Sequence, residues 1–183
     1  DDPILSLDMD GALERLEALG WVQSASITRR LPGEVHVHLV ERRPFALWQK
    51  NQSLVLIDRE GVVITSKNLG RFSTLPTVVG RDAPKHVADL LDTLATEPEL
   101  YSRVAAAIRI AGRRWDIRLA NDIVIRLPED SPALGWKRLA ALQREHAILG
   151  RDLAAIDLRL EDRLIVRLGA KAAKLRRAPG NNT

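Results

Sequence analysis

The alternation of apolar and polar residues is clearest in the first quarter of the chain, where it predicts a β-hairpin. Apolar side chains recur at every second position, weakly over residues 24–31 and cleanly over residues 34–40, as in strands with one buried face. The Leu-Pro-Gly of residues 31–33 lies between the two runs, and Pro and Gly favour the backbone angles of a tight turn. Another strand pattern follows at residues 45–48 without a gap of linker length. The sequence therefore predicts two folding units joined by one extended segment.

A short helix precedes the hairpin. Leucines at helical spacing predict a helix over residues 9–19, with Asp8 or Asp10 as its N-cap. One helix and two strands offer little surface to pack against each other. We therefore expect this first unit, residues 1–43, to be completed by a strand and a helix upstream of Asp1. Between the two units we expect a solvated interdomain hinge made of Glu41, Arg42, Arg43 and Pro44.

The remaining pattern predicts a mostly antiparallel sheet with two flanking helices, so the fold class is α+β. Strands are predicted at residues 45–48, 54–57, 62–65, 105–111, 115–120, 123–127, 155–160 and 164–168. Amphipathic helices are predicted from Pro84 and over residues 131–149, each with apolar residues on one face. Residues 75–80 form an extended linker in this interpretation. The second unit covers residues 44–168, and residues 169–183 form a flexible basic tail that frays.

Composition narrows the classes of function. The 183 residues are 45% hydrophobic and 28% charged, as in ordinary globular proteins. The net charge is +4, and the 28 Lys and Arg residues are scattered among 24 acidic ones with only 4% aromatic residues, which argues against a nucleic-acid surface. Cysteine is absent, so disulfides and thiol catalysis are excluded. No apolar run approaches the about 18 residues of a transmembrane helix. Because the chain starts without Met or a signal peptide, we expect it to be part of a longer protein.

No residue pattern points to catalysis, so we expect a non-enzymatic protein with neither a cofactor nor a metal. His36 and His38 point to the same face of a strand, but no Cys or third His lies nearby in sequence. His146 lies on or beside the apolar stripe of its helix. Three carboxylate pairs lie in turns or helix caps, where we expect no burial that would raise a pKa: Asp58 with Glu60, Glu129 with Asp130, and Glu161 with Asp162.

The last predicted strand, residues 163–168, offers a different kind of site. Leu164, Val166 and Leu168 share a face suited to the core, while Ile165 lies between two arginines on the opposite face. If this strand is at the edge of the sheet, its free N–H and C=O groups can pair with a strand of another chain. The arginines would disfavour self-pairing and favour an acidic partner. An ordinary protected edge strand is the alternative interpretation.

The same segments carry a family resemblance. Residues 16–48, which include the stretch VERRPFALW at residues 40–48, closely resemble the junction between the POTRA and β domains of the FtsQ family of bacterial cell division proteins, called DivIB in Gram-positive bacteria. RRWDI through IRLP at residues 113–128 and DLRL at residues 157–160 are similar to two further FtsQ-type stretches in the same order. The resemblance therefore extends over nearly the whole chain.

The resemblance implies a partial POTRA domain followed by an FtsQ-type β domain, in the periplasmic region of a single-pass protein of the cell inner membrane. Members of the family are scaffolds of the divisome that link early and late division proteins during septum formation. They bind FtsB as the primary contact, and FtsL, and FtsB adds a strand beside the final strand of the β domain. Other division proteins are expected at the POTRA unit. By position, the resemblance implies partner contacts at Glu129, Leu160, Asp162, Ile165 and Arg167.

Two further functions are weighed against this one. A POTRA-type chaperone or secretion module that handles unfolded β-clients predicts tandem copies of the pattern of residues 21–40 and a downstream barrel, and the sequence contains neither. A hydrolase that uses His146 with Glu145 has no nucleophile or pocket signature in the sequence.

Overall fold

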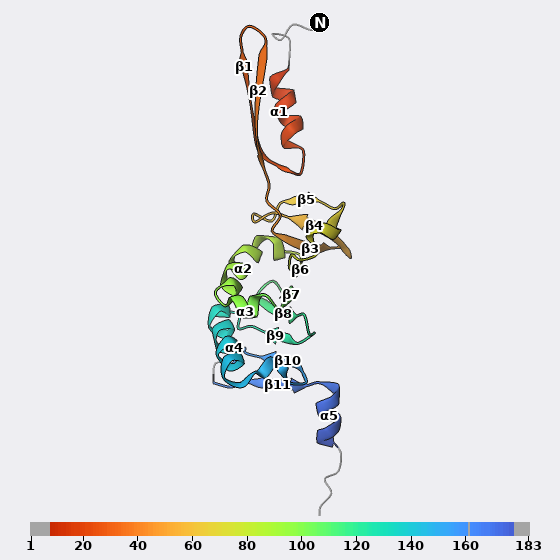
Figure 1. The fold of residues 1–183 in the computed structure, drawn as a ribbon, viewed down its shortest axis with the longest axis vertical. Coiled ribbons are helices and arrows are strands. Elements are labelled where there is room, and N and C mark those ends of the chain that lie inside the picture. Colours follow the sequence, from red (N-terminus) through yellow and green to blue (C-terminus); the bar gives the residue numbers. More distant parts are fainter. Residues whose placement is uncertain (1–7, 161, 178–183) are drawn as a thin grey trace, which may run out of the picture.

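The computed structural model describes residues 8–160 and 162–177. The molecule is elongated, with a helix and a hairpin at one end and a short helix at the other (Figure 1). The first end contains α1 (Met9–Glu17), β1 (Val22–Arg30) and β2 (Glu34–Glu41). These bounds confirm the predicted helix and hairpin. None of the described helices is both long and apolar enough to cross a bilayer.

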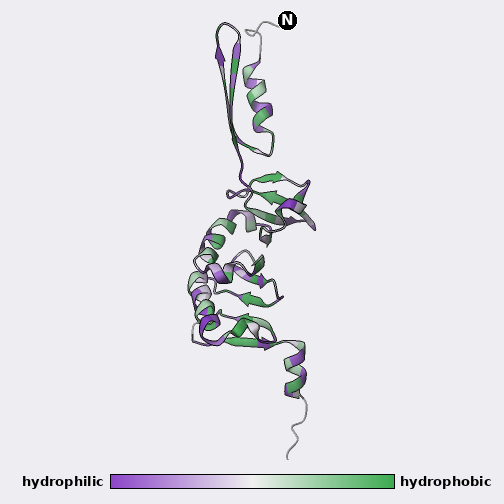
Figure 2. Cartoon of the chain, in the orientation of Figure 1, coloured by the Kyte–Doolittle hydropathy of each residue, from purple (hydrophilic) through white to green (hydrophobic). Residues whose placement is uncertain are grey.

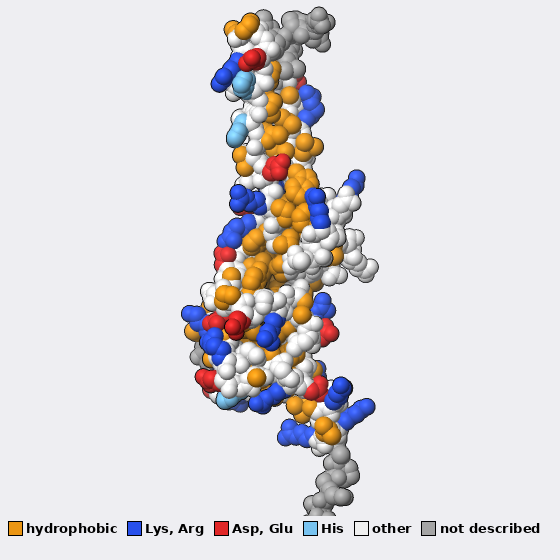
Figure 3. Space-filling view, in the orientation of Figure 1, with side chains coloured by type: hydrophobic (Ala, Val, Ile, Leu, Met, Phe, Trp, Pro, Cys, Tyr) orange, Lys and Arg blue, Asp and Glu red, His pale blue; other side chains and the backbone are white. Residues whose placement is uncertain are grey.

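The first unit forms by local rules. The carboxylate of Asp8 accepts a hydrogen bond from the backbone N–H of Gly11 at 2.9 Å and so caps α1. The two strands pair antiparallel, with Ile27 opposite Val37. No residue of α1 is buried, and Val37 and Leu39 stay exposed on β2. A band of hydrophobic side chains is therefore visible along this end of the molecule (Figure 3).

The second unit is a nine-stranded sheet in the order β11-β10-β9-β8-β7-β6-β3-β4-β5. Its strands are β3 (Ala46–Lys50), β4 (Ser53–Ile57), β5 (Val63–Thr65), β6 (Thr77–Val79), β7 (Val104–Ile110), β8 (Arg114–Leu119), β9 (Val124–Arg126), β10 (Leu153–Asp157) and β11 (Ile165–Leu168). Five of the eight strand pairings are antiparallel and three are parallel. The α+β class with a mostly antiparallel sheet is confirmed.

One prediction in this region was wrong. Residues 75–80 are not a linker, because they contain β6, which pairs in parallel with both β3 and β7. Val78 at its centre is fully buried. A strand of three residues shows no alternation that a sequence pattern can detect, and only its neighbours on both sides make it a strand.

Helices cover one face of this sheet (Figure 1). They are α2 (Val87–Ala95), α3 (Pro98–Tyr101) and α4 (Pro132–His146), with the 3-10 turns η3 (Ala83–Lys85) and η4 (Ile148–Gly150). Figure 2 shows hydrophobic and hydrophilic residues mixed along these helices, and the buried ones include Leu90 and Leu94 of α2 and Leu139 of α4. Trp136 of α4 is fully buried, and its indole N–H donates to the carbonyl of Leu94 in α2 at 3.0 Å. This bond ties the two long helices together above the core.

Two predicted ends differ from the structure. The predicted helix to residue 149 stops at His146, because Ala147 takes a left-handed conformation with φ of 48°. The predicted fraying tail begins instead with α5 (Ala170–Arg177), and residues 178–183 lie outside the described residues. The backbone N–H of Ala172 donates to the carboxylate of Asp152 at 2.6 Å, so a residue that directly precedes β10 caps this helix.

Candidate docking edge and the junction between the sheets

The strand β11 is the open edge of the nine-stranded sheet. It pairs antiparallel with β10 on one side, with Ile165 opposite Asp157 and Leu168 opposite Leu153. On its other side no strand of the described residues pairs with it. Since N–H and C=O groups alternate in direction along a strand, about half of those on β11 point away from the sheet. The predicted edge position is confirmed.

The opposite edge of the same sheet is covered by the chain itself. The turn between α1 and β1 passes so close to β5 that a Cβ atom on Gly20 would lie 2.1 Å from the carbonyl oxygen of Ile64. Trp21 packs next to it on a small cluster of Leu47, Leu56 and Ile64, with Leu69, Phe72 and Leu75 also packed there. The chain's own turn thus packs against the β5 edge at Ile64, whereas no described strand pairs with the outer side of β11.

This close approach gives the first testable prediction. Gly20→Ala places a methyl group against a backbone oxygen that has no room to move, so we expect a loss of about 1–3 kcal/mol in the free energy of unfolding. Gly33→Ala is the matched control, because a Cβ at Gly33 would meet no atom within 4 Å. Urea unfolding of both variants measures the difference. Equal midpoints for the two variants would contradict the close packing of Gly20.

The exposed side chains of β11 differ from the predicted pattern. Val166 was predicted to lie on the face suited to the core, and the register places it on that face beside Ile156, but its side chain is 41% exposed. It continues a row across the sheet in which Ile156, Ile125 and Ile117 are each fully buried. The row ends at Val166 with no further strand beside it, so its side chain stays in solvent. The exposed side chain of Val166 could pack against a side chain of an added strand, which would extend the same row.

The other face of the edge carries a charged row. Asp116, Arg126 and Asp157 lie in register on β8, β9 and β10, and Ile165 of β11 ends the row. Arg159 binds the Asp157 carboxylate through its Nη2 at 2.6 Å, and this hydrogen bond is the main reason that the pKa of Asp157 lies below its usual value. The carboxylate of Asp157 is thus paired inside the molecule, while Ile165 remains 51% exposed.

The loop between β10 and β11 is attached to α4. Arg138 donates from Nη1 to the carbonyl of Leu160 at 3.2 Å and to the carbonyl of Arg163 at 3.5 Å. Leu160 and Asp162 of this loop are both exposed, and the Arg163 guanidinium lowers the pKa of the Asp162 carboxyl. Beside the loop lies a cavity of about 260 Å³ lined by Pro128, Ser131, Leu134, Gly135, Arg138 and Leu158.

Of the five predicted contact residues, four lie together and one does not. Leu160, Asp162, Ile165 and Arg167 belong to the terminal hairpin and are exposed. Glu129 instead pairs with Arg113 at 3.8 Å and lines a separate cavity of about 190 Å³ next to α2. No hydrogen bond or ion pair joins Glu129 to the hairpin among the described residues. The grouping of Glu129 with the other four stays a prediction.

The junction between the sheets holds a buried ion pair that sequence reasoning missed. Arg42 donates from Nη1 to Asp58 Oδ2 at 2.7 Å, and the two side chains are 17% and 3% exposed. Two expectations were therefore wrong: Arg42 is not part of a solvated connector, and Asp58 is not an exposed turn carboxylate. The other oxygen of Asp58 accepts from the backbone N–H of Val62 at 2.8 Å. The sequence showed that Asp58 opens a turn, but it did not show that Arg42, 16 residues away, would be its partner.

Further contacts fix the same junction. The backbone N–H of Arg42 donates to the carbonyl of Trp21 at 2.8 Å. The guanidinium of Arg71 lies over the rings of Trp21 and Phe72, at 5.7 and 4.8 Å from their centroids. Glu41 and Arg43 are exposed, and Pro44 is half-buried. The hinge role of these residues stays a prediction.

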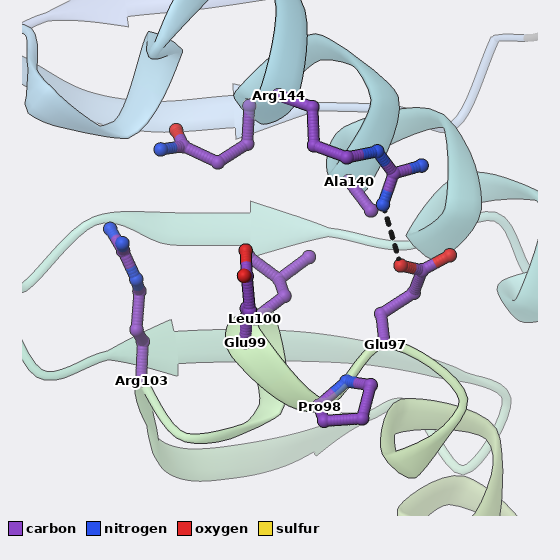
Figure 4. A pocket seen from close by; sticks show the side chains of 8 residues that line it. Glu97, Pro98, Glu99, Leu100, Arg103, Ala140 and Arg144 are labelled. Atoms are coloured by element: carbon purple, nitrogen blue, oxygen red, sulfur yellow. Dashed lines mark hydrogen bonds and ion pairs between the residues drawn. The ribbon is translucent and has the colours of Figure 1, made fainter.

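Another cavity contains an ion pair. It measures about 250 Å³ and lies between α3 and α4 (Figure 4). Its Arg144 and Glu97 bind each other at 2.8 Å, so their charges cancel.

Across the described ranges, no three His, Cys, Asp or Glu side chains are placed to hold a metal ion. His36 is exposed and 3.3 Å from Glu34, and His146 is exposed.

Two family models match the chain. The model "Cell division protein FtsQ/DivIB, C-terminal" matches residues 46–159, and the model "POTRA domain, FtsQ-type" matches residues 1–42. The two matched segments meet where the two-stranded sheet gives way to the nine-stranded one. Together they cover residues 1–42 and 46–159, which include every described strand except β11.

Relatives named "Cell division protein FtsQ" are similar over most of the chain. Those of Rhizobium meliloti and Rhizobium radiobacter are each 43% identical over 173 residues, 94% of this chain. The chain spans 56% of the first relative and 82% of the second. A solved extracytoplasmic domain of DivIB from Geobacillus stearothermophilus aligns over 60% of this chain and 97% of its own, with a TM-score of 0.40 and 14% identity. The family models and the relatives place this chain in the FtsQ/DivIB family of cell division proteins.

Proposed function

We propose that this chain is the docking region of a divisome scaffold that binds FtsB, and with it FtsL, by adding an FtsB strand to β11. The scaffold would thereby link early and late division proteins during septum formation. The observation that carries the proposal is the contrast between the two edges of one sheet. The β5 edge is covered by the turn at Gly20, while β11 is open.

The surroundings of β11 support the same mode of binding. Ile165 and Val166 expose apolar surface on opposite faces of the edge, so an added strand would gain side-chain contacts on both faces. Arg138 holds the preceding loop by two carbonyl groups, which fixes the start of the strand before a partner arrives. A preordered edge lowers the entropy cost of binding.

The proposal includes the placement of the chain in the cell. Residues 1–43 would be the C-terminal part of a POTRA domain and residues 44–168 the β domain, both in the periplasm. An anchor that precedes residue 1 would cross the inner membrane once. The POTRA part would be free to contact other division proteins.

A proline in β11 tests the proposal. Ile165→Pro removes a backbone N–H and constrains φ at the edge, so we expect binding to the periplasmic part of FtsB to be lost in a pull-down. The melting temperature should change little, since the strand is at the edge. Ile165→Ala is the control, because it shortens the side chain but keeps the N–H group, and should retain measurable binding. Because adjacent N–H groups point in opposite directions, Val166→Pro is tested in parallel. Unchanged binding in both proline variants would overturn strand addition.

A further inference from the structure

We propose that the end of β11 and the helix α5 form a basic extension of the docking edge that binds an acidic segment of the strand partner. The basic extension consists of Arg167, Lys171, Lys174 and Arg176. This proposal rests on the proposed function for the position of the partner strand. It adds that the partner's segment next to that strand is acidic.

Charge is unbalanced in this part of the chain. Residues 164–177 contain five Lys and Arg residues and no Asp or Glu. In the preceding loop each arginine has its own acid, since Arg159 binds Asp157 and Arg163 binds Asp162. The four residues of the basic extension form no ion pair with any other described residue. Their charge is therefore available to a partner.

The helix α5 is held in place at its start. The carboxylate of Asp152 accepts from the N–H of Ala172, and the carbonyl of Asp152 accepts from the N–H of Gly169 at 2.9 Å. Gly169 is the residue that permits this contact, because a Cβ there would lie 2.0 Å from Asp152 Oδ1. Asp152 directly precedes β10, so α5 is attached to the sheet beside the open edge. Its position relative to β11 is thus set by hydrogen bonds to the carboxylate and the carbonyl of Asp152 and not by the four basic side chains.

The side of α5 that faces solvent is both basic and apolar. Lys171 and Lys174 are three residues apart and lie on one side of the helix, and both are exposed. Leu175 lies beside them and is 79% exposed, while Ala172 and Ala173 are half-buried. Figure 3 shows blue side chains around the orange ones at this end of the molecule. An acidic peptide with an apolar side chain fits such a surface.

The position of α5 favours a peptide over a lipid surface. Figure 1 shows α5 at the end of the molecule that is opposite to α1. In the proposed arrangement the membrane anchor precedes residue 1, so the basic extension would lie at the end away from the bilayer. A strand that pairs with β11 would run past the start of α5, because α5 begins two residues after Leu168.

Charge reversal tests the basic extension. The variant is Lys171→Glu with Lys174→Glu, in the whole chain, and the probe is the periplasmic part of FtsB. Glu has a helix propensity close to that of Lys, so α5 should be kept. We expect affinity to fall about tenfold at low salt, because the new Glu side chains would repel the acidic segment that the Lys side chains attract. The difference should shrink at high salt, where exposed charges are screened.

The control is Lys67→Glu with Lys85→Glu, which makes the same charge change at exposed sites elsewhere and should change affinity less than about twofold.

Each outcome decides between the two proposals. If Ile165→Pro abolishes binding and the charge-reversed variant binds like its control, the basic extension is overturned and strand addition stands. If the proline variants bind normally while charge reversal weakens binding, the basic extension stands and strand addition fails. If charge reversal removes binding to phosphatidylglycerol vesicles but not to FtsB, the surface binds lipid and the proposal is overturned.

Discussion

Asp58→Ala is expected to lower the free energy of unfolding by about 3–5 kcal/mol, because it removes a buried carboxylate and leaves the partly buried guanidinium of Arg42 without its partner. The Arg42 side chain is 17% exposed and its Nη1 lies 2.7 Å from the carboxylate that the variant removes. The substitution also deletes the acceptor of the Val62 N–H, which closes the turn after β4. Urea unfolding followed by circular dichroism measures the loss.

The adjacent residue of the same turn supplies a matched control. Arg59 forms an ion pair with Asp92 in which both side chains are more than half exposed. Water screens such a pair, so Arg59→Ala should lower stability far less than Asp58→Ala. Asp58→Asn keeps an oxygen for the turn and should fall between the two. Similar losses for Asp58→Ala and Arg59→Ala would contradict the burial of the Arg42–Asp58 pair.

Trp136→Ala should have a comparable effect, a loss of about 3–5 kcal/mol, through a cavity in the core. Trp136 is fully buried, and its indole N–H binds the carbonyl of Leu94. The substitution therefore removes both the packing between α4 and the sheet and the bond that joins α4 to α2. Thermal and urea unfolding of the variant measure the change.

Two variants separate these contributions. Trp136→Phe removes the indole donor and part of the ring, while the Leu94 carbonyl keeps the backbone N–H of Glu97 as a donor at 3.2 Å, so we expect a loss of about 1–2 kcal/mol. Leu134→Ala lies on the same helix at an exposed position and should stay within about 0.5 kcal/mol of the parent chain. A loss below about 1.5 kcal/mol for Trp136→Ala would show that α4 does not depend on this residue.

The sequence predicted most strands because each has a local cause. The hairpin of β1 and β2 has alternating side chains and a Pro-Gly turn, and the pairs β3–β4, β7–β8 and β10–β11 are adjacent in the chain. Short loops join antiparallel neighbours, so adjacent patterns pair. The strand β6 was missed because its three residues become a strand only through parallel partners that lie far away in the sequence.

The candidate site was predicted in part for the same reason. The open edge followed from the position of the last strand, and Ile165 and Arg167 are exposed there. The burial of Val166 was predicted wrongly, since alternation gives the face of a side chain but not whether anything covers that face. The helix α5 was missed because its cap, Asp152, lies 20 residues from Ala172.

By itself the sequence determined the class of fold, the two successive units, the terminal edge strand and the lack of a catalytic motif, because hydrophobic period, turn residues and composition act over short distances. Only the tertiary structure decided which edge is covered, through Gly20 against Ile64. It also decided that Arg42 meets Asp58 out of solvent. These features depend on residues brought together from distant parts of the chain, and no local pattern encodes such distances.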